Sequence, residues 1–215
     1  TAIAIVPIVH QENDSTLRVY GKVTNAKTSE PISAKLTFTG ATVNKSVYAS
    51  LSGYKIDVNS TDQFKIQVEA EGFISTLEEL DINTIEMKNL EMNFKLEPVS
   101  VGTKVNLKSV LFEQGSTNLL PGSYQEIDLV VAFLNANPSV RIELLGHTDN
   151  RGVHSHNVKL SQARVDRVKD YMVSKGIASK RIKGKGYGGT QHIADNTNEE
   201  TRMLNRRVEF RITRY

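Results

Sequence analysis

The chain has 215 residues, with 27 Lys and Arg, 24 Asp and Glu and no cysteine, which gives a formal net charge of +3. The missing cysteines exclude disulfides and cysteine-ligated zinc or iron–sulfur sites. The content of 39% hydrophobic and 24% charged residues is typical of a folded globular protein. The longest apolar run, at 129–134, is far shorter than the roughly 20 residues of a membrane-spanning helix. Because the chain begins at Thr1 without a methionine, we expect a processed or excised piece in which any targeting segment is not in view.

The charge is divided unevenly along the chain. Residues 1–99 carry 9 basic and 13 acidic side chains, whereas residues 100–215 carry 18 basic and 11 acidic ones. A change of sign of this size favours two domains, which we place at 1–99 and 100–215. A basic second domain could bind nucleic acid, a membrane surface or another anionic polymer, or it could simply have a solvated cationic surface.

The first predicted domain contains short stretches in which apolar residues recur at every second position. These stretches cover residues 17–23, 34–38, 54–58, 64–68 and 90–96. The alternation is typical of half-buried strands, and turn-forming residues separate the stretches at roughly ten-residue intervals. We therefore predict an N-terminal all-β sandwich with antiparallel pairing, and residues 2–9 as an edge strand or a lead-in.

This half of the chain resembles the carboxypeptidase-regulatory-like, or transthyretin-like, sandwich domains. The resemblance rests on Gly-Lys-Val at 21–23, Glu-Pro-Ile-Ser-Ala at 30–34 and Gly-Tyr-Lys-Ile-Asp-Val at 53–58. It continues in Phe-Lys-Ile-Gln-Val at 64–68 and Gly-Phe at 72–73. The resemblance implies a non-catalytic spacer or interaction module, with other cell-envelope proteins as its partners.

The second predicted domain alternates strands and helices. Apolar residues at helical spacing mark two helices, of which Pro138 ends the first and Gly176 the second. The helices are expected at 122–137 and 158–175, and the strands at 105–112, 140–145, 181–186 and 207–212. The order β-α-β-α-β-β predicts an α/β domain, a mixed sheet with helices on one face.

Arg164 falls inside the apolar stripe of the second predicted helix. An arginine there should either extend to solvent or meet a carboxylate. Asp149 is the candidate, since it follows the 140–145 strand and crossover folds place ligand sites at such strand ends. An Asp and an Arg held side by side would bind a zwitterion, the carboxylate taking an ammonium group and the guanidinium a carboxylate. The two side chains could equally pair with each other.

Residues 102–213 also resemble the OmpA-like C-terminal domain. The motifs that carry the resemblance are Gly-His-Thr-Asp at 146–149, Leu-Ser-Gln-Ala-Arg at 160–164 and Asn-Arg-Arg-Val-Glu at 205–209. The resemblance implies reversible, non-covalent binding of bacterial peptidoglycan, without enzymatic activity and without a cofactor. It also implies a place in the periplasm, in association with the outer membrane, where the protein would anchor an assembly to the cell wall.

The same resemblance assigns the contact with the diaminopimelate of the stem peptide to Asp149 and Arg164. Supporting positions lie in or beside the three motifs, at Gly146, His147, Thr148, Asn157, Leu160, Asn205, Arg206 and Arg207. The sequence departs from the family at Val165, where alanine is usual, and at His192, where proline is common. Neither departure involves the Asp–Arg pair.

Other chemistries compete on the residues alone. His147, Asp149, His154 and His156 lie within ten residues and could hold zinc or nickel. Basic clusters at 180–185 and 202–207 could bind nucleic acid or another anionic polymer, although aromatic stacking residues are sparse beside them. An enzyme is not expected, because the sequence has no metalloprotease, phosphate-loop or serine-hydrolase motif.

Overall fold

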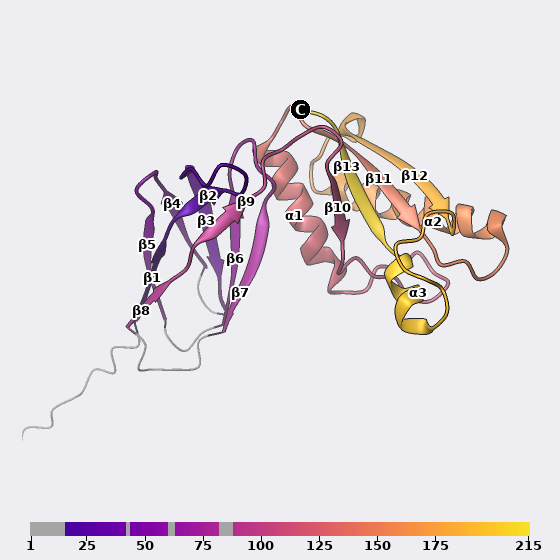
Figure 1. Cartoon of the computed structure of the whole chain (residues 1–215), viewed down its shortest axis with the longest axis horizontal. Coiled ribbons are helices and arrows are strands. Elements are labelled where there is room, and N and C mark those ends of the chain that lie inside the picture. Colours follow the sequence, from indigo (N-terminus) through magenta and orange to yellow (C-terminus); the bar gives the residue numbers. More distant parts are fainter. Residues whose placement is uncertain (1–15, 42–43, 60–62, 82–87) are drawn as a thin grey trace, which may run out of the picture.

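The computed structural model describes residues 16–41, 44–59, 63–81 and 88–215. The edge strand expected at 2–9 lies outside these residues. The described chain has mixed α/β structure, with several sheets and three α-helices (Figure 1). None of the helices in this part of the chain has both the length and the apolar composition needed to cross a bilayer.

Strands, without a helix, make up the regular structure of the described residues between 16 and 96. They pair in the orders β5-β1-β8 and β4-β3-β6-β7, with β2 and β9 forming a further pair. The strands are β1 (Thr16–Gly21), β2 (Val23–Asn25), β3 (Ala34–Thr39), β4 (Asn44–Ala49), β5 (Tyr54–Asn59), β6 (Gln63–Glu69), β7 (Thr76–Asp81), β8 (Asn89–Glu91) and β9 (Phe94–Leu96).

The alternation of side chains decides which face of each strand is buried. Phe64, Ile66 and Val68 of β6 face one cluster of hydrophobic side chains, which Leu17 and Val19 of β1 also enter. The sequence predicted this alternation correctly. The expected antiparallel pairing was wrong in part, since β1 pairs with β8, and β2 with β9, in parallel. Parallel neighbours need a crossover rather than a hairpin, and the alternation of side chains does not report the direction of pairing.

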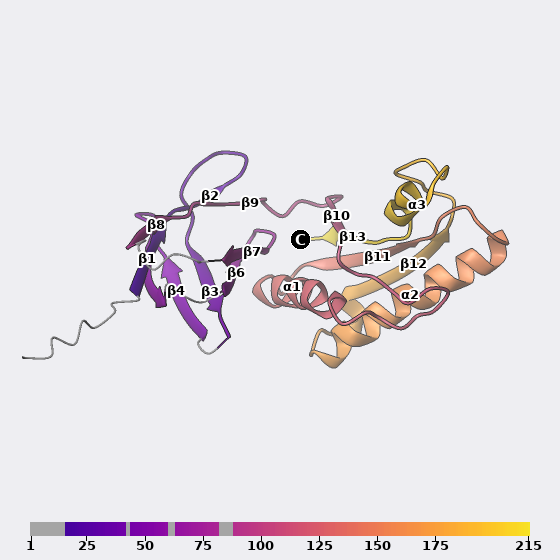
Figure 2. The same cartoon turned by 90° about the horizontal axis from the view of Figure 1, so that it is seen from below.

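The remaining elements build a four-stranded sheet with the order β10-β13-β11-β12. In it β11 and β12 are parallel, and β13 runs antiparallel to both of its neighbours. The helices α1 and α2 lie along one side of this sheet and α3 lies on the other (Figure 2). The elements are β10 (Lys104–Leu107), α1 (Ser123–Ala136), β11 (Arg141–His147), α2 (His154–Ser174), the 3-10 helix η1 (Ser179–Arg181), β12 (Ile182–Gly188), α3 (Glu199–Asn205) and β13 (Val208–Arg214).

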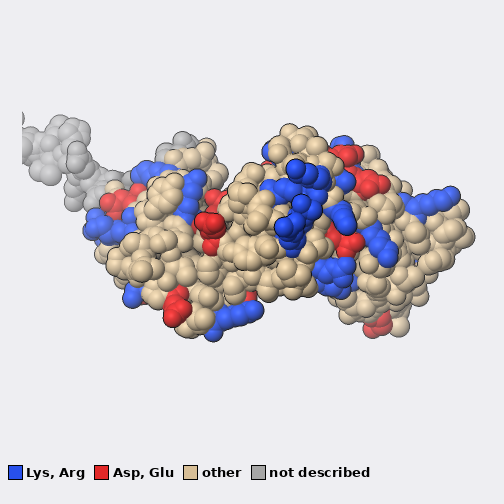
Figure 3. Space-filling model, turned by 90° about the horizontal axis from the view of Figure 1, so that it is seen from above, with Lys and Arg blue, Asp and Glu red and all other residues tan. Residues whose placement is uncertain are grey.

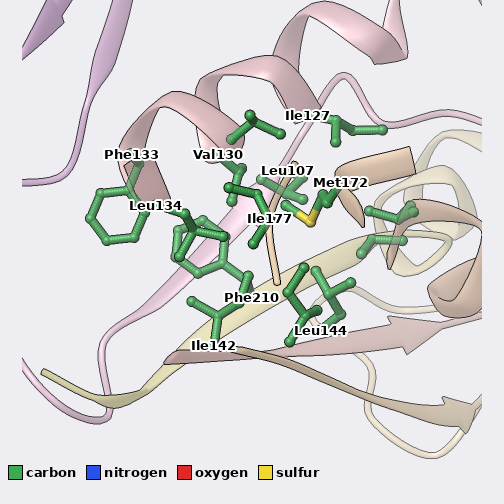
Figure 4. Close-up of a cluster of buried hydrophobic side chains, with 14 of the residues drawn as sticks. Leu107, Ile127, Val130, Phe133, Leu134, Ile142, Leu144, Met172, Ile177 and Phe210 are labelled. Atoms are coloured by element: carbon green, nitrogen blue, oxygen red, sulfur yellow. The ribbon is translucent and has the colours of Figure 1, made fainter. Parts of the chain in front are cut away.

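A second hydrophobic cluster fills the space between this sheet and the helices α1 and α2 (Figure 4). Ile142 and Leu144 of β11, Leu134 of α1 and Met172 of α2 are fully buried in it. Helix α2 lies close to the sheet because β12 has glycines where it passes. A Cβ atom on Gly186 would lie 2.4 Å from the backbone nitrogen of Gln162 in α2. The backbone of α2 is therefore held at a fixed distance from the strands that carry the candidate site.

Several boundaries differ from the sequence prediction. The strand expected at 105–112 ends at Leu107, because residues 108–120 form turns and a single bridge between Phe112 and Leu119. Helix α2 begins at His154 rather than at residue 158. The prediction missed α3, which has only seven residues, and with it the placement of every helix on one face of the sheet. Met203 and Leu204, the apolar residues of segment 199–205, are adjacent and so give no helical period that would reveal so short a helix.

Asn137 joins the two parts of the chain. It is 1% exposed, and its Oδ1 accepts a hydrogen bond from the backbone nitrogen of Gly72 at 2.7 Å. Its Nδ2 donates to the carbonyl oxygen of Phe133 at 2.9 Å, at the end of α1. Ile74 packs against the hydrophobic cluster of the second part. One buried amide therefore links the segment after β6 to the helix that covers the four-stranded sheet.

Candidate functional site

Asp149 lies just beyond the end of β11, as the sequence predicted from its position after a strand. Its Oδ2 accepts a hydrogen bond from Nη1 of Arg206 at 2.9 Å, and its Oδ1 accepts one from the backbone nitrogen of Arg151 at 3.1 Å. The side chain is 13% exposed. Both carboxylate oxygens are thus oriented by the protein, and each keeps a further lone pair with which it could accept a donor from a ligand.

Arg164 is buried on α2, with 7% of its surface exposed. Its Nε donates to the carbonyl oxygen of Ser116 at 3.0 Å, and Nη2 donates to that of Glu113 at 3.4 Å. The guanidinium carbon lies 4.8 Å from the centre of the Phe112 ring, within the range of a cation–π contact. The sequence prediction that Arg164 would extend to solvent or meet a carboxylate was therefore wrong, because backbone carbonyls and an aromatic face hold it instead.

The cation of Arg164 has no ion-pair partner among the described residues, and its Nη1 makes no hydrogen bond to them. Burial lowers the pKa of Arg164; nearby Arg206 lowers it further, and Asp149 opposes this shift. Arginine stays protonated in proteins even when its pKa falls in this way. The site therefore contains a desolvated positive charge with a free donor, an arrangement that favours a carboxylate ligand.

The sequence also suggested that Asp149 and Arg164 might pair with each other. Within the described residues they form no ion pair, and Asp149 pairs with Arg206 instead. Arg206 follows α3 and also donates from Nη2 to Glu199 at 2.6 Å. Burial alone would lower the pKa of Arg206, but its bonds to Asp149 and Glu199 raise it overall. The pairing leaves Arg164 available and places Arg206 between two carboxylates.

Asp149, Arg164, Arg206 and Glu199 line one groove with a volume of about 720 Å³. Phe112 forms part of its wall, and three apolar side chains, Leu111, Leu120 and Met203, are 42%, 37% and 54% exposed at the same groove. Glu199 and Met203 were missed by the sequence analysis because they belong to α3. The groove offers a free cation, an oriented carboxylate and apolar contact area, which together suit a zwitterionic group on a short aliphatic chain.

Four of the expected supporting residues line the groove, namely Arg206, Thr148, Asn157 and Leu160. The Asn157 amide donates to the carbonyl oxygen of Arg151 at 2.8 Å and so fixes the loop that follows Asp149. Thr148 Oγ1 donates to the carbonyl oxygen of Asp149 at 2.9 Å. Thr148 and Asn157 therefore hold the shape of the loop that carries Asp149.

Gly146 and His147 lie beneath the groove. Gly146 is buried against α2, where a Cβ atom would lie 2.6 Å from the carbonyl oxygen of Ser161. His147 is 1% exposed, stacks on Tyr187 at 5.5 Å between ring centres, and has no hydrogen-bond partner on either ring nitrogen. Burial lowers the pKa of His147 to about 4, so its ring is neutral at pH 7.

The two remaining supporting residues do not line the groove, although Arg207 lines a small adjoining cavity with Arg164 and Arg206. Asn205 is fully buried, and its Oδ1 accepts from the backbone nitrogens of Ile193 and Ala194 at 2.8 and 3.1 Å. Arg207 pairs with Glu209 at 2.7 Å and donates to the carbonyl oxygen of Gln191. The resemblance gave them supporting positions, and the structure shows them organising the loop between β12 and α3.

The structure does not bring His147, Asp149, His154 and His156 together as a metal site. His154 and His156 are exposed in the first turn of α2, whereas His147 is buried. Among the described residues no group of three or more His, Asp or Glu side chains is arranged to hold a metal ion. In the basic cluster at 202–207, Arg202, Arg206 and Arg207 are all engaged in ion pairs, which leaves fewer free charges for nucleic acid.

The residues that line the groove lie in a segment that matches a family model. Residues 111–206 match the model of the OmpA family. The OmpA match spans Asp149, Arg164 and Arg206 and begins at Leu111, at the rim of the groove.

Curated proteins are also similar to part of this chain. The chain is 40% identical over 112 residues to outer membrane porin F of Pseudomonas fluorescens, which covers 52% of this chain and 34% of the relative. It is 37% identical over 101 residues to the peptidoglycan-binding protein ArfA of Mycobacterium tuberculosis, covering 47% and 31%. The chain thus spans about a third of the length of these relatives.

One solved structure similar to this chain is the crystal structure of the peptidoglycan-associated lipoprotein from Burkholderia pseudomallei. It aligns with a TM-score of 0.45 and 21% identity over 49% of this chain and 88% of that one.

Proposed function

We propose that the part of the chain that matches the OmpA family binds peptidoglycan non-covalently and anchors a larger protein or assembly to the cell wall. The observation that carries the proposal is the buried Arg164, which pairs with no carboxylate of the described residues and lies in a groove that also holds the oriented carboxylate of Asp149. Diaminopimelate carries an ammonium group and a carboxylate on one carbon, so it complements this pair of charges. The name of the ArfA relative, a peptidoglycan-binding protein, agrees with peptidoglycan as the ligand.

In this proposal Arg164 receives the ligand carboxylate through Nη1, and Asp149 accepts the ligand ammonium group. Arg206 keeps the Asp149 carboxylate in place, and the exposed apolar side chains at the groove contact the aliphatic part of the stem peptide. No bond is made or broken, so the protein acts as a reversible anchor rather than as an enzyme. Neither a metal nor a cofactor takes part.

The proposal is tested by sedimentation with purified peptidoglycan that contains diaminopimelate. Asp149→Ala and Arg164→Ala should each weaken binding by at least about tenfold, the usual effect of losing a hydrogen bond to a charged group. Arg167→Ala and Asp170→Ala are matched controls, because both residues are exposed on α2. Equal sedimentation of the wild type and of both site variants would overturn the site.

We also propose the division into domains at 1–99 and 100–215, with the first a sandwich of the carboxypeptidase-regulatory-like type. The separate hydrophobic clusters of the two parts support this division. The first domain would act as a spacer or a contact for other envelope proteins. Residues 100–215 produced alone should then fold and bind peptidoglycan with unchanged affinity, and an unfolded or inactive fragment would contradict the division.

For the whole protein we propose the periplasm as its location, in association with the outer membrane. The proposal follows from the ligand, since peptidoglycan lies in that compartment, and from the likeness to an outer membrane porin. Cell fractionation followed by detachment of the protein from the isolated wall by excess stem peptide would test it. Recovery in the cytoplasmic fraction would contradict it.

A further inference from the structure

A band of basic side chains crosses the four-stranded sheet on the face opposite α1 and α2. Side chains alternate along a strand, and Ile142 and Leu144 of β11 point into the core, so Arg141 and Glu143 point to the other face. The same alternation places the odd-numbered residues of β12 and β13 there. We call the following set the basic face: Lys104, Arg141, Lys183, Lys185 and Arg211, with Glu143 among them.

The register of the sheet places these residues beside one another. Lys104 lies opposite Arg211, Arg211 opposite Glu143, and Glu143 opposite Lys183, in one row across all four strands. Lys104, Arg141, Lys183 and Lys185 are exposed. In Figure 3, Lys and Arg side chains gather on the C-terminal half of the molecule. The basic face is therefore a strip of cations at the surface of the sheet.

The charges of this strip are mostly unpaired. Glu143 pairs with Arg211, and Glu209, the other acidic residue that the alternation places on this face, is 8% exposed and pairs with Arg207. Lys104, Arg141 and Lys183 form no ion pair with any described residue, and Lys185 lies 4.8 Å from the centre of the Tyr187 ring. Strands are about 4.8 Å apart, so the row from Lys104 to Lys183 extends over roughly 14 Å. A small anion could touch only part of such a row, whereas an extended polyanion could contact all of it.

The row of the basic face crosses β11 at Glu143, and the groove lies beyond the C-terminal end of the same strand. Arg141 is the first residue of β11 and His147 the last, and Asp149 follows two residues later. A strand of this length covers roughly 20 Å. A polymer with repeated charges could therefore occupy the groove with one unit and the basic face with another. Peptidoglycan is such a polymer, because its stem peptides carry free carboxylates at every repeat.

The surroundings of the strip fit a carboxylate polymer better than a membrane or a nucleic acid. Leu145, the apolar residue in these rows, is 1% exposed, so it cannot insert into a lipid surface. Tyr187 is half-buried between Lys185 and His147, so it offers no free platform on which a base could stack. Charge without an apolar anchor or a stacking ring suits a hydrated anionic chain.

We propose that the basic face is a second contact for the wall polymer, which binds stem-peptide carboxylates by charge at a distance from the groove. This proposal rests on the proposed binding of peptidoglycan. The two contacts have separable roles, since the groove selects the zwitterion and the basic face adds affinity that depends on salt.

The test compares two triple variants of the full chain in sedimentation with peptidoglycan that contains diaminopimelate. One neutralises the strip by Lys104→Gln, Arg141→Gln and Lys183→Gln. The matched control removes the same charge from exposed lysines elsewhere, by Lys22→Gln, Lys27→Gln and Lys95→Gln. At about 50 mM salt the strip variant should bind roughly tenfold more weakly than the wild type, and at about 500 mM salt the two should converge. The control should follow the wild type at both concentrations, and thermal unfolding of both variants confirms that they fold.

The outcomes distinguish this proposal from the one on which it rests. If the wild type binds and the strip variant binds equally well at low salt, the basic face has no role, and the groove is unaffected. If the wild type fails to bind peptidoglycan at all, the proposed function fails and this inference fails with it. Amidation of the peptidoglycan carboxylates outside the diaminopimelate should reduce wild-type binding to the level of the strip variant. Tighter binding of the wild type to duplex DNA or to vesicles of anionic phospholipid than to peptidoglycan would assign the strip to those ligands and overturn the proposal.

Discussion

Nη1 of Arg206 lies 2.9 Å from Oδ2 of Asp149, across 57 residues of sequence. The contact joins the loop after β11 to the residue that follows α3. It gives the Asp149 carboxylate a fixed orientation before any ligand arrives, and within the described residues that carboxylate pairs with Arg206 rather than with Arg164. A short helix at the far end of the sequence thus controls the charge balance of the groove.

Removing the Arg206 side chain should therefore weaken binding. In Arg206→Ala the Asp149 carboxylate loses its charged hydrogen bond and turns toward the free cation of Arg164, so we expect peptidoglycan affinity to fall about tenfold. Glu199→Ala is the graded comparison, because Glu199 also holds Arg206 but is 58% exposed, and we expect a loss below about threefold. Sedimentation with peptidoglycan measures both. A larger loss of peptidoglycan affinity in Glu199→Ala than in Arg206→Ala would contradict the prediction that Arg206 contributes more to binding than Glu199 does.

The packing of α2 against β12 should be sensitive to one methyl group. Gly186→Ala would place a Cβ atom 2.4 Å from the backbone nitrogen of Gln162 and 2.7 Å from Oγ of Ser161, so the helix that carries Arg164 must move. We expect the free energy of unfolding to fall by about 1–3 kcal/mol, the usual effect of overpacking. Gly122→Ala is the control, since a Cβ atom there meets nothing within 4 Å and its φ of −63° suits alanine. Urea unfolding measures the free energy of unfolding of both variants. A Gly186→Ala variant as stable as the wild type would contradict the prediction and would show that α2 tolerates displacement.

Much of this arrangement could be predicted from the sequence, because regular elements report their period directly. The apolar spacing of α1 and α2 and the alternation in β6 and β11 gave those elements to within a few residues. The loop position of Asp149 and the anomalous place of Arg164 in the apolar stripe also identified two residues of the groove. The sequence resemblance then supplied Arg206.

The partners of these charges could not be predicted in the same way. Arg164 is bound by backbone carbonyls of Glu113 and Ser116, in a segment of turns that has no periodic pattern. Arg206 reaches Asp149 only because α3 ends beside the loop, and a helix of seven residues gives too weak a signal to detect. Carbonyl acceptors are present at every residue, so the identity of a side chain says nothing about which carbonyl will bind an arginine.

Asn137 should contribute to stability out of proportion to its size. In Asn137→Ala the backbone nitrogen of Gly72 loses its hydrogen-bond acceptor, whereas the carbonyl oxygen of Phe133 keeps the bond from the backbone nitrogen of residue 137. We expect unfolding to become easier by roughly 1–3 kcal/mol, because a buried group left without a hydrogen bond keeps its full desolvation cost. Asn150→Ala is the matched control, since Asn150 is exposed and its side chain makes no hydrogen bond within the described chain.

Calorimetry can also show whether Asn137 couples the two parts. If the Asn137 amide links the two parts of the chain, their melting temperatures should differ more in Asn137→Ala than in the wild type. A single transition shifted as a whole would mean that other contacts keep the parts together. An unchanged melting temperature would contradict the role of Asn137 altogether.

His147 should make the stability of the fold depend on pH. Burial is the main reason that its pKa falls from 6.5 to about 4; Arg207 and Lys104 lower it further, and Glu209 opposes them. Between these two values the unfolded chain binds more protons than the folded one, so stability rises with pH across this window. The contribution of His147 to the free energy of unfolding is complete above pH 6.5 and is lost as the pH falls to about 4. Its size is roughly 3 kcal/mol. Urea unfolding between about pH 4 and 7 measures this slope.

The carboxylates also titrate in this range, so the comparison must be made between variants. In His147→Gln the rise of stability with pH should be shallower than in the wild type, whatever the absolute stability of the variant, because the ring that resists protonation is gone. His156→Gln is the control, since His156 is exposed and its variant should keep the wild-type slope. Parallel curves for the wild type and His147→Gln would show that His147 accepts a proton in the folded state as readily as in the unfolded one. That result would require a hydrogen-bond acceptor for the protonated ring, which neither nitrogen has in this structure, where Oε2 of Glu209 lies 4.0 Å from Nε2.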